Sequence, residues 1–344
     1  MFAKTLGWTL LFAAIMAGIL PSSAPTFAAA PLIRTQSPGF YRMMLGDFEV
    51  TALLDGTHRF PVFETLMARS KSSSQNQNGS REPLADSKPG EIEARLAAAD
   101  LSVPLEGSIN AFLINTGTKL VLIDSGAGAL YGVCCGHLLE NLRASGYQPE
   151  QIDEVLLTHL HADHVGGVMA NETMAFPNAT IRVSQTDADY WLSEVNEKAA
   201  PRFLLPMFVG AQHVLRPYIA AKKFQPFQYG ADLLPSIRAI ATPGHTPGHS
   251  SYIVESRGQK LLVWGDIVHV APIQFPDPGV TVSYDNDGKQ AEQQRELLFS
   301  EAARMGYWIG AAHIAFPGLG HVGIRDTHFF WIPTEYTTEL VGAP

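Results

Sequence analysis

The sequence predicts an α/β protein in which several strands deliver metal ligands to one edge of the fold. Four apolar runs, each typical of a buried strand, lead directly to histidine or aspartate side chains. Open α/β sheets bind their ligands at the carboxyl ends of the strands, so we expect these side chains to converge. The four runs are residues 155–157, 236–241, 260–264 and 307–312.

The first run leads into His-Leu-His-Ala-Asp-His, residues 159–164. Neutral imidazole nitrogen and carboxylate oxygen are ligands that zinc and similar divalent metals accept. An extended backbone sends His159 and His161 to one side, and a following turn can direct Asp163 and His164 towards a neighbouring point. The spacing therefore suits two adjacent metal ions better than one. The alternative is a polar loop whose histidines are only solvated or hydrogen-bonded.

The other three runs supply the ligands that a two-metal centre still needs. Residues 242–249 read Thr-Pro-Gly-His-Thr-Pro-Gly-His and place His245 and His249 in one turn. The next run is followed by Asp266, and the last by His313. Because a ligand-type side chain follows every one of these strands, the pattern indicates a metal centre.

The remaining elements are predicted from local patterns. Residues 48–54 alternate enough for a strand, and residues 109–115 and 119–123 read as a strand pair around a Thr-Gly-Thr turn. The first and last of the helical segments are followed by a glycine, which commonly ends a helix. Helices are predicted at residues 137–145, 187–198 and 290–305.

The segment 66–100 differs from its surroundings. Residues 70–80 are polar and contain no aromatic side chain, so they cannot bury a core and are expected to form a mobile loop. Residues 91–99 predict a short helix. The chain has 344 residues, 46% of them hydrophobic, which is enough for one large core or two small ones. We predict a single domain over residues 31–344.

Charge and the N-terminus restrict the partners and the compartment. A net charge of −9 argues against nucleic acid or an anionic membrane as partner. Residues 1–30 read as a secretory signal peptide, with Lys4, an apolar region at 6–20 and Ala-Ala-Ala at 28–30. This predicts a secreted or periplasmic protein that does not contact a membrane after cleavage. The alternative is an uncleaved N-terminal anchor.

The two cysteines, Cys134 and Cys135, are adjacent. Neighbouring cysteines seldom reach the geometry of a disulfide, so no disulfide framework is expected. No histidine or acid pattern surrounds them, which argues against a metal site. We expect them to be buried small residues on a helix.

The order of these motifs resembles that of the metallo-β-lactamase superfamily. Three stretches outside the metal motif, residues 38–49, 146–151 and 316–321, are similar to the methyl parathion hydrolase group within it. The resemblance covers nearly all of the mature chain. It implies the αββα four-layer sandwich of the superfamily, and the dimers of the family suggest a homodimer.

The resemblance also implies a role for each ligand-type residue. The expected ligands are His159, His161 and His245 for one ion, Asp163, His164 and His313 for the other, and Asp266 as the bridge between them. Asp124 is expected behind the metals, where it orients a ligand; the alternative is a turn-capping aspartate. His249 is expected to be structural or to support a ligand. The cofactors would be two divalent ions, zinc first, with manganese, cobalt or iron as alternatives.

The expected reaction is metal-dependent hydrolysis. Two ions that share Asp266 are expected to share a water or hydroxide, whose pKa such ions lower to about 7. Asp163 would accept a proton as the intermediate collapses. No G-x-S-x-G or P-loop motif supplies a competing nucleophile. A non-enzymatic metal-binding or regulatory module is the alternative, but all seven ligand positions are filled.

The substrate is expected to lie against Trp191, residues 203–208 and the loop after Asp266, where apolar side chains suit an aromatic leaving group. A core position is the alternative for Trp191. His269 and Tyr284 stand where the methyl parathion hydrolases carry leucine, which makes the pocket more polar. We therefore expect a small-molecule lactone or aryl ester as substrate, with weak phosphotriesterase side activity. The alternative is an efficient organophosphate phosphotriesterase. A β-lactamase is disfavoured, because that branch differs at the second metal site.

Overall fold

The computed structural model describes residues 30, 32–68, 82–230 and 233–340. The predicted signal peptide therefore lies outside the described residues, apart from Ala30, and so does the polar stretch 70–80. Residues Pro38–Pro344 form one compact unit. Among the described residues, no helix combines the length and the hydropathy needed to span a membrane.

Six strands form the first sheet of this unit. Neighbours from β1 to β5 pair antiparallel, whereas β5, β6 and β9 pair parallel. In sheet order the strands are β1 (Phe40–Leu45), β2 (Phe48–Phe60), β4 (Leu105–Asn115), β5 (Leu120–Ile123), β6 (Glu154–Leu156) and β9 (Thr180–Arg182). The strands predicted at 48–54, 109–115 and 119–123 are confirmed, and the first of them runs further than predicted.

Six more strands form the second sheet. Only β12 and β14 pair parallel in it, and the other neighbours are antiparallel. In sheet order the strands are β10 (Ile237–Ala241), β11 (Ser250–Ser256), β12 (Gln259–Val263), β14 (Trp308–Gly310), β15 (Leu319–Arg325) and β16 (His328–Pro333). Two short pairs lie outside both sheets: β3 (Leu66–Met67) with β13 (Thr281–Val282), and β7 (Met169–Ala170) with β8 (Thr173–Met174).

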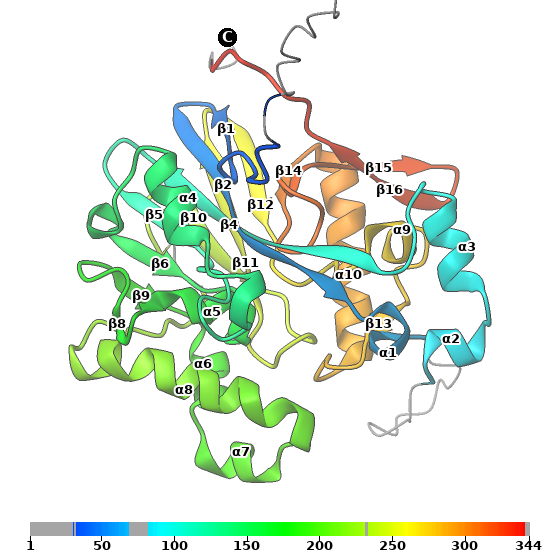
Figure 1. Ribbon diagram of the computed structural model, residues 1–344, viewed down its shortest axis with the longest axis horizontal. Helices are drawn as coiled ribbons and strands as arrows, with labels where there is room; N and C mark the ends of the chain where they lie inside the picture. Colours follow the sequence, from blue (N-terminus) through cyan, green and yellow to red (C-terminus); the bar gives the residue numbers. More distant parts are fainter. Residues whose placement is uncertain (1–29, 31, 69–81, 231–232, 341–344) are drawn as a thin grey trace, which may run out of the picture. The chain divides into compact units, whose positions relative to one another are not determined.

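The two sheets pack face to face, with helices on their outer faces (Figure 1). Side chains alternate along each strand, so one strand serves two layers. On β4, Phe112 and Ile114 join the core between the sheets, whereas Leu113 joins the core under the outer helices. On β12, Leu261 lies between the sheets and Leu262 faces the opposite helix layer. This is the predicted αββα sandwich.

The helices cover the two outer faces unequally. Residues of α4, α6 and α8 pack on the first sheet, and residues of α10 pack on the second. The α-helices are α1 (Val62–Thr65), α2 (Leu84–Ser87), α3 (Glu91–Ala97), α4 (Leu138–Ala144), α5 (Ala162–Val165), α6 (Gln185–Trp191), α7 (Glu194–Ala199), α8 (Leu205–Ala220), α9 (Ala271–Gln274) and α10 (Gly288–Met305). Short 3-10 turns are Gly132–Cys134, Pro149–Gln151, Gly166–Val168 and Arg202–Leu204.

The helices predicted at 91–99, 137–145 and 290–305 are confirmed, and Gly306 ends the last of them in the left-handed conformation. The helix predicted at 187–198 is instead two helices. Ser193 interrupts it, because its side chain accepts the backbone N–H of Asn196 and so begins α7. The sequence analysis did not predict α8, which contains Pro217.

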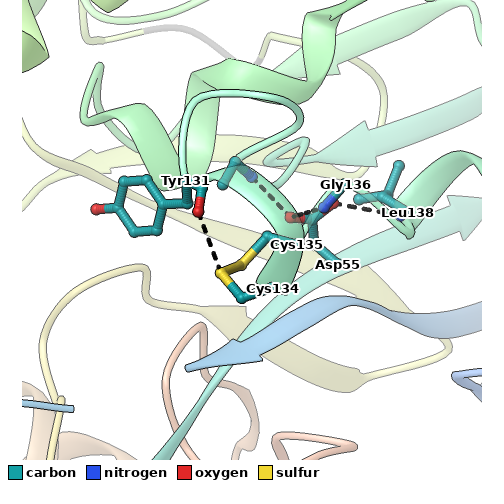
Figure 2. The surroundings of a disulfide bond; sticks show 7 residues. Asp55, Tyr131, Cys134, Cys135, Gly136 and Leu138 are labelled. Atoms are coloured by element: carbon teal, nitrogen blue, oxygen red, sulfur yellow. Dashed lines mark hydrogen bonds between the residues drawn. A yellow bond between two sulfur atoms is a disulfide. The ribbon is translucent and has the colours of Figure 1, made fainter. Parts of the chain in front are cut away.

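The structure corrects the expectation for the two cysteines. Cys134 and Cys135 form a disulfide with each other (Figure 2). They do not lie within an α-helix: Cys134 ends a 3-10 turn and Cys135 is extended. The surrounding loop is held in place by the buried carboxylate of Asp55, which accepts the backbone N–H groups of Gly136 and Leu138. Asp55 also accepts the backbone N–H of Ala127, so the loop is fixed on both sides of the disulfide.

Candidate metal centre

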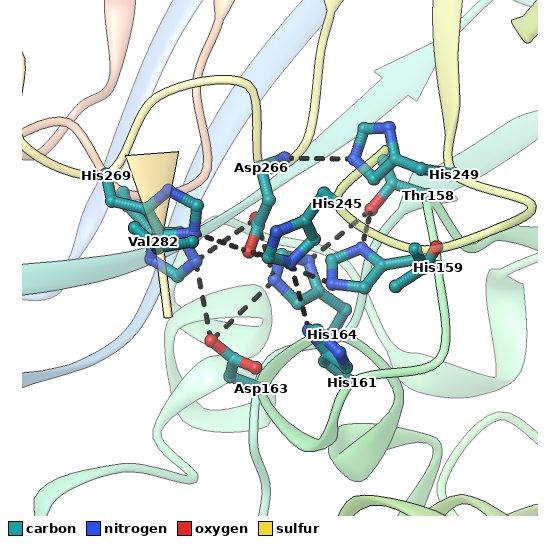
Figure 3. A network of polar contacts seen from close by, with 12 residues as sticks. Thr158, His159, His161, Asp163, His164, His245, His249, Asp266, His269 and Val282 are labelled. Carbon is teal, nitrogen blue, oxygen red and sulfur yellow. Dashed lines mark hydrogen bonds and ion pairs between the residues drawn. The ribbon is translucent and has the colours of Figure 1, made fainter. Parts of the chain in front are cut away.

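The loops that follow β6, β10, β12 and β14 converge on one buried cluster of histidines and aspartates (Figure 3). Each of the seven residues predicted as ligands is at most 8% exposed. In chain order they are His159, His161, Asp163, His164, His245, Asp266 and His313. The structure therefore brings together every residue predicted for the centre, from both sheets.

The first group consists of His159, His161, His245 and Asp266, whose ligand atoms all lie within 4.8 Å of one another. Nε2 of His245 is 3.0 Å from Nδ1 of His161 and 3.1 Å from Oδ2 of Asp266. Nε2 of His159 is 3.7 Å from the same Oδ2. Three imidazoles and one carboxylate oxygen are a donor set suited to one divalent ion.

The second group consists of Asp163, His164 and His313, again with ligand atoms within 4.8 Å. The other oxygen of Asp266, Oδ1, lies 3.0 Å from Nε2 of His164 and 3.1 Å from Nε2 of His313. The two oxygens of Asp266 thus face different groups. This is the arrangement that a bridging carboxylate requires.

Unsatisfied polar atoms indicate that these residues fit a pair of metal ions. Nε2 of His159, Nε2 of His164 and Oδ1 of Asp266 are among the buried side-chain atoms of the described residues that form no hydrogen bond of acceptable geometry, although Oδ1 of Asp266 lies close to two imidazoles. Burying such atoms unpaired is costly, and metal coordination removes that cost. The chemistry of the donors therefore fits two divalent ions, while the role of each residue as a ligand stays a prediction.

Partners behind the first loop orient its imidazoles. Asp124, at the end of β5, lies with Oδ2 2.9 Å from Nδ1 of His164 and accepts the hydroxyl of Thr158. That hydroxyl lies 3.0 Å from Nδ1 of His159. A partner on Nδ1 leaves Nε2 directed at the centre, as is usual for metal-bound histidines. Asp124 therefore lies where it was predicted, behind the ligands.

The ligands of the second sheet have partners of the same kind. Nδ1 of His245 is 2.7 Å from Oδ1 of the buried Asp285, and Nδ1 of His313 is 2.9 Å from the carbonyl oxygen of Ser108. His249 lies elsewhere: its Nε2 accepts the backbone N–H of Asp266 at 3.1 Å, and its Nδ1 lies 2.8 Å from the hydroxyl of Thr242. Both ring nitrogens of His249 are thus engaged away from the two ligand groups, in the supporting position that was predicted.

The protonation of the cluster follows from its carboxylates. Burial opposes charge on the imidazoles, but Asp266 and Asp285 raise the pKa of His245 to about 9. Asp266, Asp163 and Asp124 likewise raise the pKa of His164 well above its ordinary value. The charges of these imidazoles hold the pKa of Asp266 well below the usual range of a carboxyl group, despite its burial. Burial, together with neighbouring imidazoles, lowers the pKa values of His159 and His161 well below the ordinary value, so only part of the cluster carries protons in the metal-free chain.

A cavity of about 350 Å³ opens beside the cluster. Its lining includes His161, Asp163, Asp266 and His313 from the cluster, and His58, Arg59, Phe60, Pro61, Thr65, Tyr131, Met207 and Tyr284 around them. Tyr284 therefore lies in the predicted pocket, and Met207 represents the predicted stretch 203–208. A more open hollow of about 590 Å³, over Arg238 and Glu255, contains none of the predicted ligands.

Two of the predicted pocket residues do not line this cavity. Trp191 is only 2% exposed and packs in the core, with its ring 4.9 Å from that of His161 and 4.5 Å from that of Phe208. His269 is 4% exposed, and its Nε2 lies 3.1 Å from Oδ2 of Asp266. Trp191 thus supports a ligand through packing, and His269 contacts the bridge.

The sequence analysis missed Tyr131, Asp187 and Asp285. Tyr131 hydrogen-bonds Asp163, and burial beside this carboxylate raises the pKa of its phenol, so the hydroxyl stays protonated. No metal-ligand spacing marks any of the three residues. Ser184 and Asp187 have the spacing of a helix capping box, so the sequence indicates only the start of a helix. It does not indicate that Asp187 is completely buried.

Comparison with known proteins agrees with this architecture. The model of the metallo-beta-lactamase superfamily matches residues 104–305, more than half of the chain. The crystal structure of AbOPH, a hydrolase in the β-lactamase superfamily, is 37% identical with a TM-score of 0.77, and the match covers 88% of this chain and 100% of that one. AidC, a dizinc quorum-quenching lactonase, is 26% identical with a TM-score of 0.75, covering 87% and 99%.

Curated relatives match over a shorter part. An N-acyl homoserine lactonase from Bacillus cereus is 26% identical over 122 residues, which are 36% of this chain and 40% of the lactonase. One from a Bacillus species is 29% identical over 123 residues, 41% of its length. This chain thus matches about two fifths of each of these lactonases.

The buried cluster of histidines and aspartates lies where the two packed sheets meet. This fold with such a cluster is that of a class of metal-dependent hydrolases. The chain belongs to the metallo-β-lactamase superfamily. Its own cluster supplies groups of histidine and aspartate donors that could hold metal ions.

Proposed function

We propose that the protein is a dinuclear hydrolase of lactones or aryl esters, with weaker activity on phosphotriesters. The observation that carries this proposal is the position of Asp266, whose two oxygens face two separate groups of ligand atoms beside a cavity. Two divalent ions bound there, zinc first among them, would polarise the scissile bond and supply a water that is nucleophilic at neutral pH.

The side chains of the chain contribute binding and proton transfer. Asp163 lines the cavity, and the charges of His164 and His313 outweigh its burial and lower its pKa. Its carboxylate is therefore ionised at neutral pH and can take up the proton of the attacking hydroxyl as the ester bond breaks, and then deliver it to the leaving oxygen. Tyr131 donates its hydroxyl on the same side and keeps Asp163 oriented. The burial of the cluster excludes bulk water.

The lining of the cavity favours a carbonyl substrate with an apolar portion. Phe60, Met207 and the edge of Tyr284 offer apolar surface, whereas His58 and the phenols of Tyr131 and Tyr284 offer hydrogen bonds. Lactonases among the relatives support the same substrate class. The resemblance to methyl parathion hydrolases supports the second candidate, an efficient phosphotriesterase.

A hydrolysis panel tests the proposal. Purified protein is assayed against an N-acyl homoserine lactone, a simple aryl ester and an aryl phosphotriester, with and without a chelator. We expect the highest kcat/KM with the lactone or the aryl ester, and loss of all activities with chelator. A phosphotriester as the best substrate would favour the second candidate, and activity that resists metal removal would contradict both.

Export and dimerisation are two further parts of the proposal. Export to the periplasm or medium is inferred from residues 1–30, and a homodimer from the resemblance. N-terminal sequencing of the mature protein tests the first, and the mass of the protein in solution tests the second. A mature protein that still begins at Met1 would contradict cleavage.

A further inference from the structure

One buried carboxylate outside the predicted ligand set connects the two loops that carry the first metal group. Asp187, on α6, is completely buried. Its Oδ2 accepts the backbone N–H of Leu160 at 2.8 Å. Its Oδ1 accepts the hydroxyl of Thr246 at 2.6 Å and the backbone N–H of Gly248 at 3.1 Å. Three hydrogen bonds compensate a carboxylate that would otherwise be costly to bury.

The partners of Asp187 lie in two different segments that carry predicted metal ligands. Leu160 stands between His159 and His161, in the loop that follows β6 of the first sheet. Thr246 follows His245, in the turn that follows β10 of the second sheet. Asp187 therefore joins two segments that come from different sheets and that together carry all three histidines of the first group.

The turn is held on a second side by the neighbouring serine. Ser184 donates its hydroxyl to the carbonyl oxygen of Gly248 at 2.6 Å and accepts the backbone N–H of Asp187 at 3.1 Å. A Cβ atom at Gly248 would collide with the backbone nitrogen of Asp187, so only glycine lets the turn approach this closely. Both polar groups of the Gly248 backbone are thus fixed by the start of α6.

We propose that Asp187 is a positioning residue that sets the distance between the His159–His161 loop and His245, and thereby the affinity of one of the two metal positions. The inference rests on the proposed dinuclear function. The second group is held differently, since Asp163 and His164 lie on α5 and His313 follows β14. Loss of the Asp187 contacts is therefore expected to affect one metal selectively.

The variant Asp187→Asn tests this with little change of volume. An amide keeps one oxygen acceptor but replaces the other by an NH₂ group, which cannot accept the N–H of Leu160 or the groups of the turn. Asp189→Asn is the matched control, because it lies on the same helix, is exposed and bonds only the side chain of Gln185 among the described contacts. Zinc binding to metal-free protein is followed by competition with a chromophoric chelator, and the melting temperature of each metal-free protein is measured.

We expect two zinc ions per chain in the parent protein and in Asp189→Asn. In Asp187→Asn, one ion should bind 10- to 100-fold more weakly, the usual cost of losing a group behind a metal ligand, and the other should be nearly unchanged. Two ions bound with parental affinity would overturn the inference, and so would an equal weakening of both. A parent protein that binds no zinc would instead refute the proposed function.

A second variant covers the case in which Asp187→Asn does not fold. Thr246→Val removes the hydroxyl that reaches Asp187 and keeps the shape of the buried side chain. The same ion should bind more weakly, by a smaller factor, with the metal-free melting temperature close to that of the parent. Unchanged affinity for both ions in this variant would contradict the role of Asp187.

Discussion

The backbone N–H of Asp266 donates to Nε2 of His249, at 3.1 Å. Burial and the neighbouring His245 lower the pKa of His249 to about 3, so the ring is neutral and its Nε2 lone pair is free to accept. That lone pair therefore accepts the backbone N–H of Asp266 and is not available to a metal ion. The contact distinguishes the two histidines of the Thr-Pro-Gly-His-Thr-Pro-Gly-His turn.

The first prediction concerns this pair. His249→Ala should keep both metals and much of the activity, at a stability cost on the order of 1–3 kcal/mol for the unsatisfied N–H of Asp266. His245→Ala should lose one metal and nearly all activity. Elemental analysis of the two purified variants, with kcat/KM for each, checks the prediction. The opposite behaviour of the two variants would show that the ligand in this turn is assigned to the wrong histidine.

The second prediction concerns metal number. Two metals per chain are expected, and His159→Ala and Asp266→Ala should both abolish hydrolysis. Asp266→Ala should release the most metal, because each oxygen of Asp266 faces a different group. Metal content and activity are measured on the same preparations, with Asp189→Asn as a folded control. Active protein that contains only trace metal would refute the dinuclear model.

The third prediction concerns His269, which stacks on His313 at 5.2 Å and contacts Oδ2 of Asp266. We expect His269→Leu to shift activity from carbonyl esters towards aryl phosphotriesters. His269 lies behind the cavity lining, against Phe60 and Tyr284, so leucine acts on the cavity through these two residues. The apolar surface gained there is worth about 1–3 kcal/mol for an aryl group held against them. The variant also removes the contact between Nε2 of His269 and Oδ2 of Asp266, worth about 0.5–1.5 kcal/mol, and this loss affects both substrates alike.

The ratio of the two kcat/KM values is the quantity to measure for His269→Leu, since it cancels differences in folding and metal loading. A ratio that is unchanged or moves towards the esters would mean that His269 affects only the bridge and not the choice of substrate.

The fourth prediction concerns pH. In the metal-free chain the pKa of His245 is raised to about 9 by Asp266 and Asp285, against the opposing effect of burial. The charged imidazole therefore stabilises the metal-free fold fully below about pH 6.5, and this contribution is lost as the pH rises through about 9. A metal needs the neutral imidazole, so apparent metal affinity should rise over the same range.

Proton release is the direct measurement for this prediction. Titration calorimetry of zinc binding at pH 7.5, in buffers of different ionisation enthalpy, should show at least one proton released per chain. The metal-free melting temperature should fall between pH 6.5 and 9. Zinc binding without proton release would contradict the charged state of His245.

Local patterns made much of this structure predictable. His159, His161, Asp163 and His164 lie within six residues, so their common role depends on backbone periodicity and little on the rest of the fold. The strand that precedes each remaining ligand is also a local pattern. The assembly of the strands into two sheets is not a local pattern. Residues 111–114 of β4 alternate between two cores although all four are apolar, so the sandwich could be expected only from the resemblance.

The errors concern features that tertiary packing decides. Whether Trp191 points into the cavity or into the core depends on Phe208 of α8. This helix is difficult to predict from the sequence because it contains Pro217. The Cys134–Cys135 disulfide depends on a loop fixed by Asp55, which lies far away along the chain. The buried role of Asp187 depends on a turn that begins more than fifty residues later.

Asp266 faces ligands from both sheets, so a cut of the chain between the sheets would separate the ligands of each metal group. A cut before β10 would leave His159, His161, Asp163 and His164 on one fragment and every other predicted ligand on the second. Neither fragment alone could complete either metal group, because each group includes ligands from both sheets. A metal that binds only the joined state stabilises that state by an amount that grows with the logarithm of the free metal concentration, so free zinc would hold two separately produced halves together. Reassembly of such halves would then report the concentration of the metal itself.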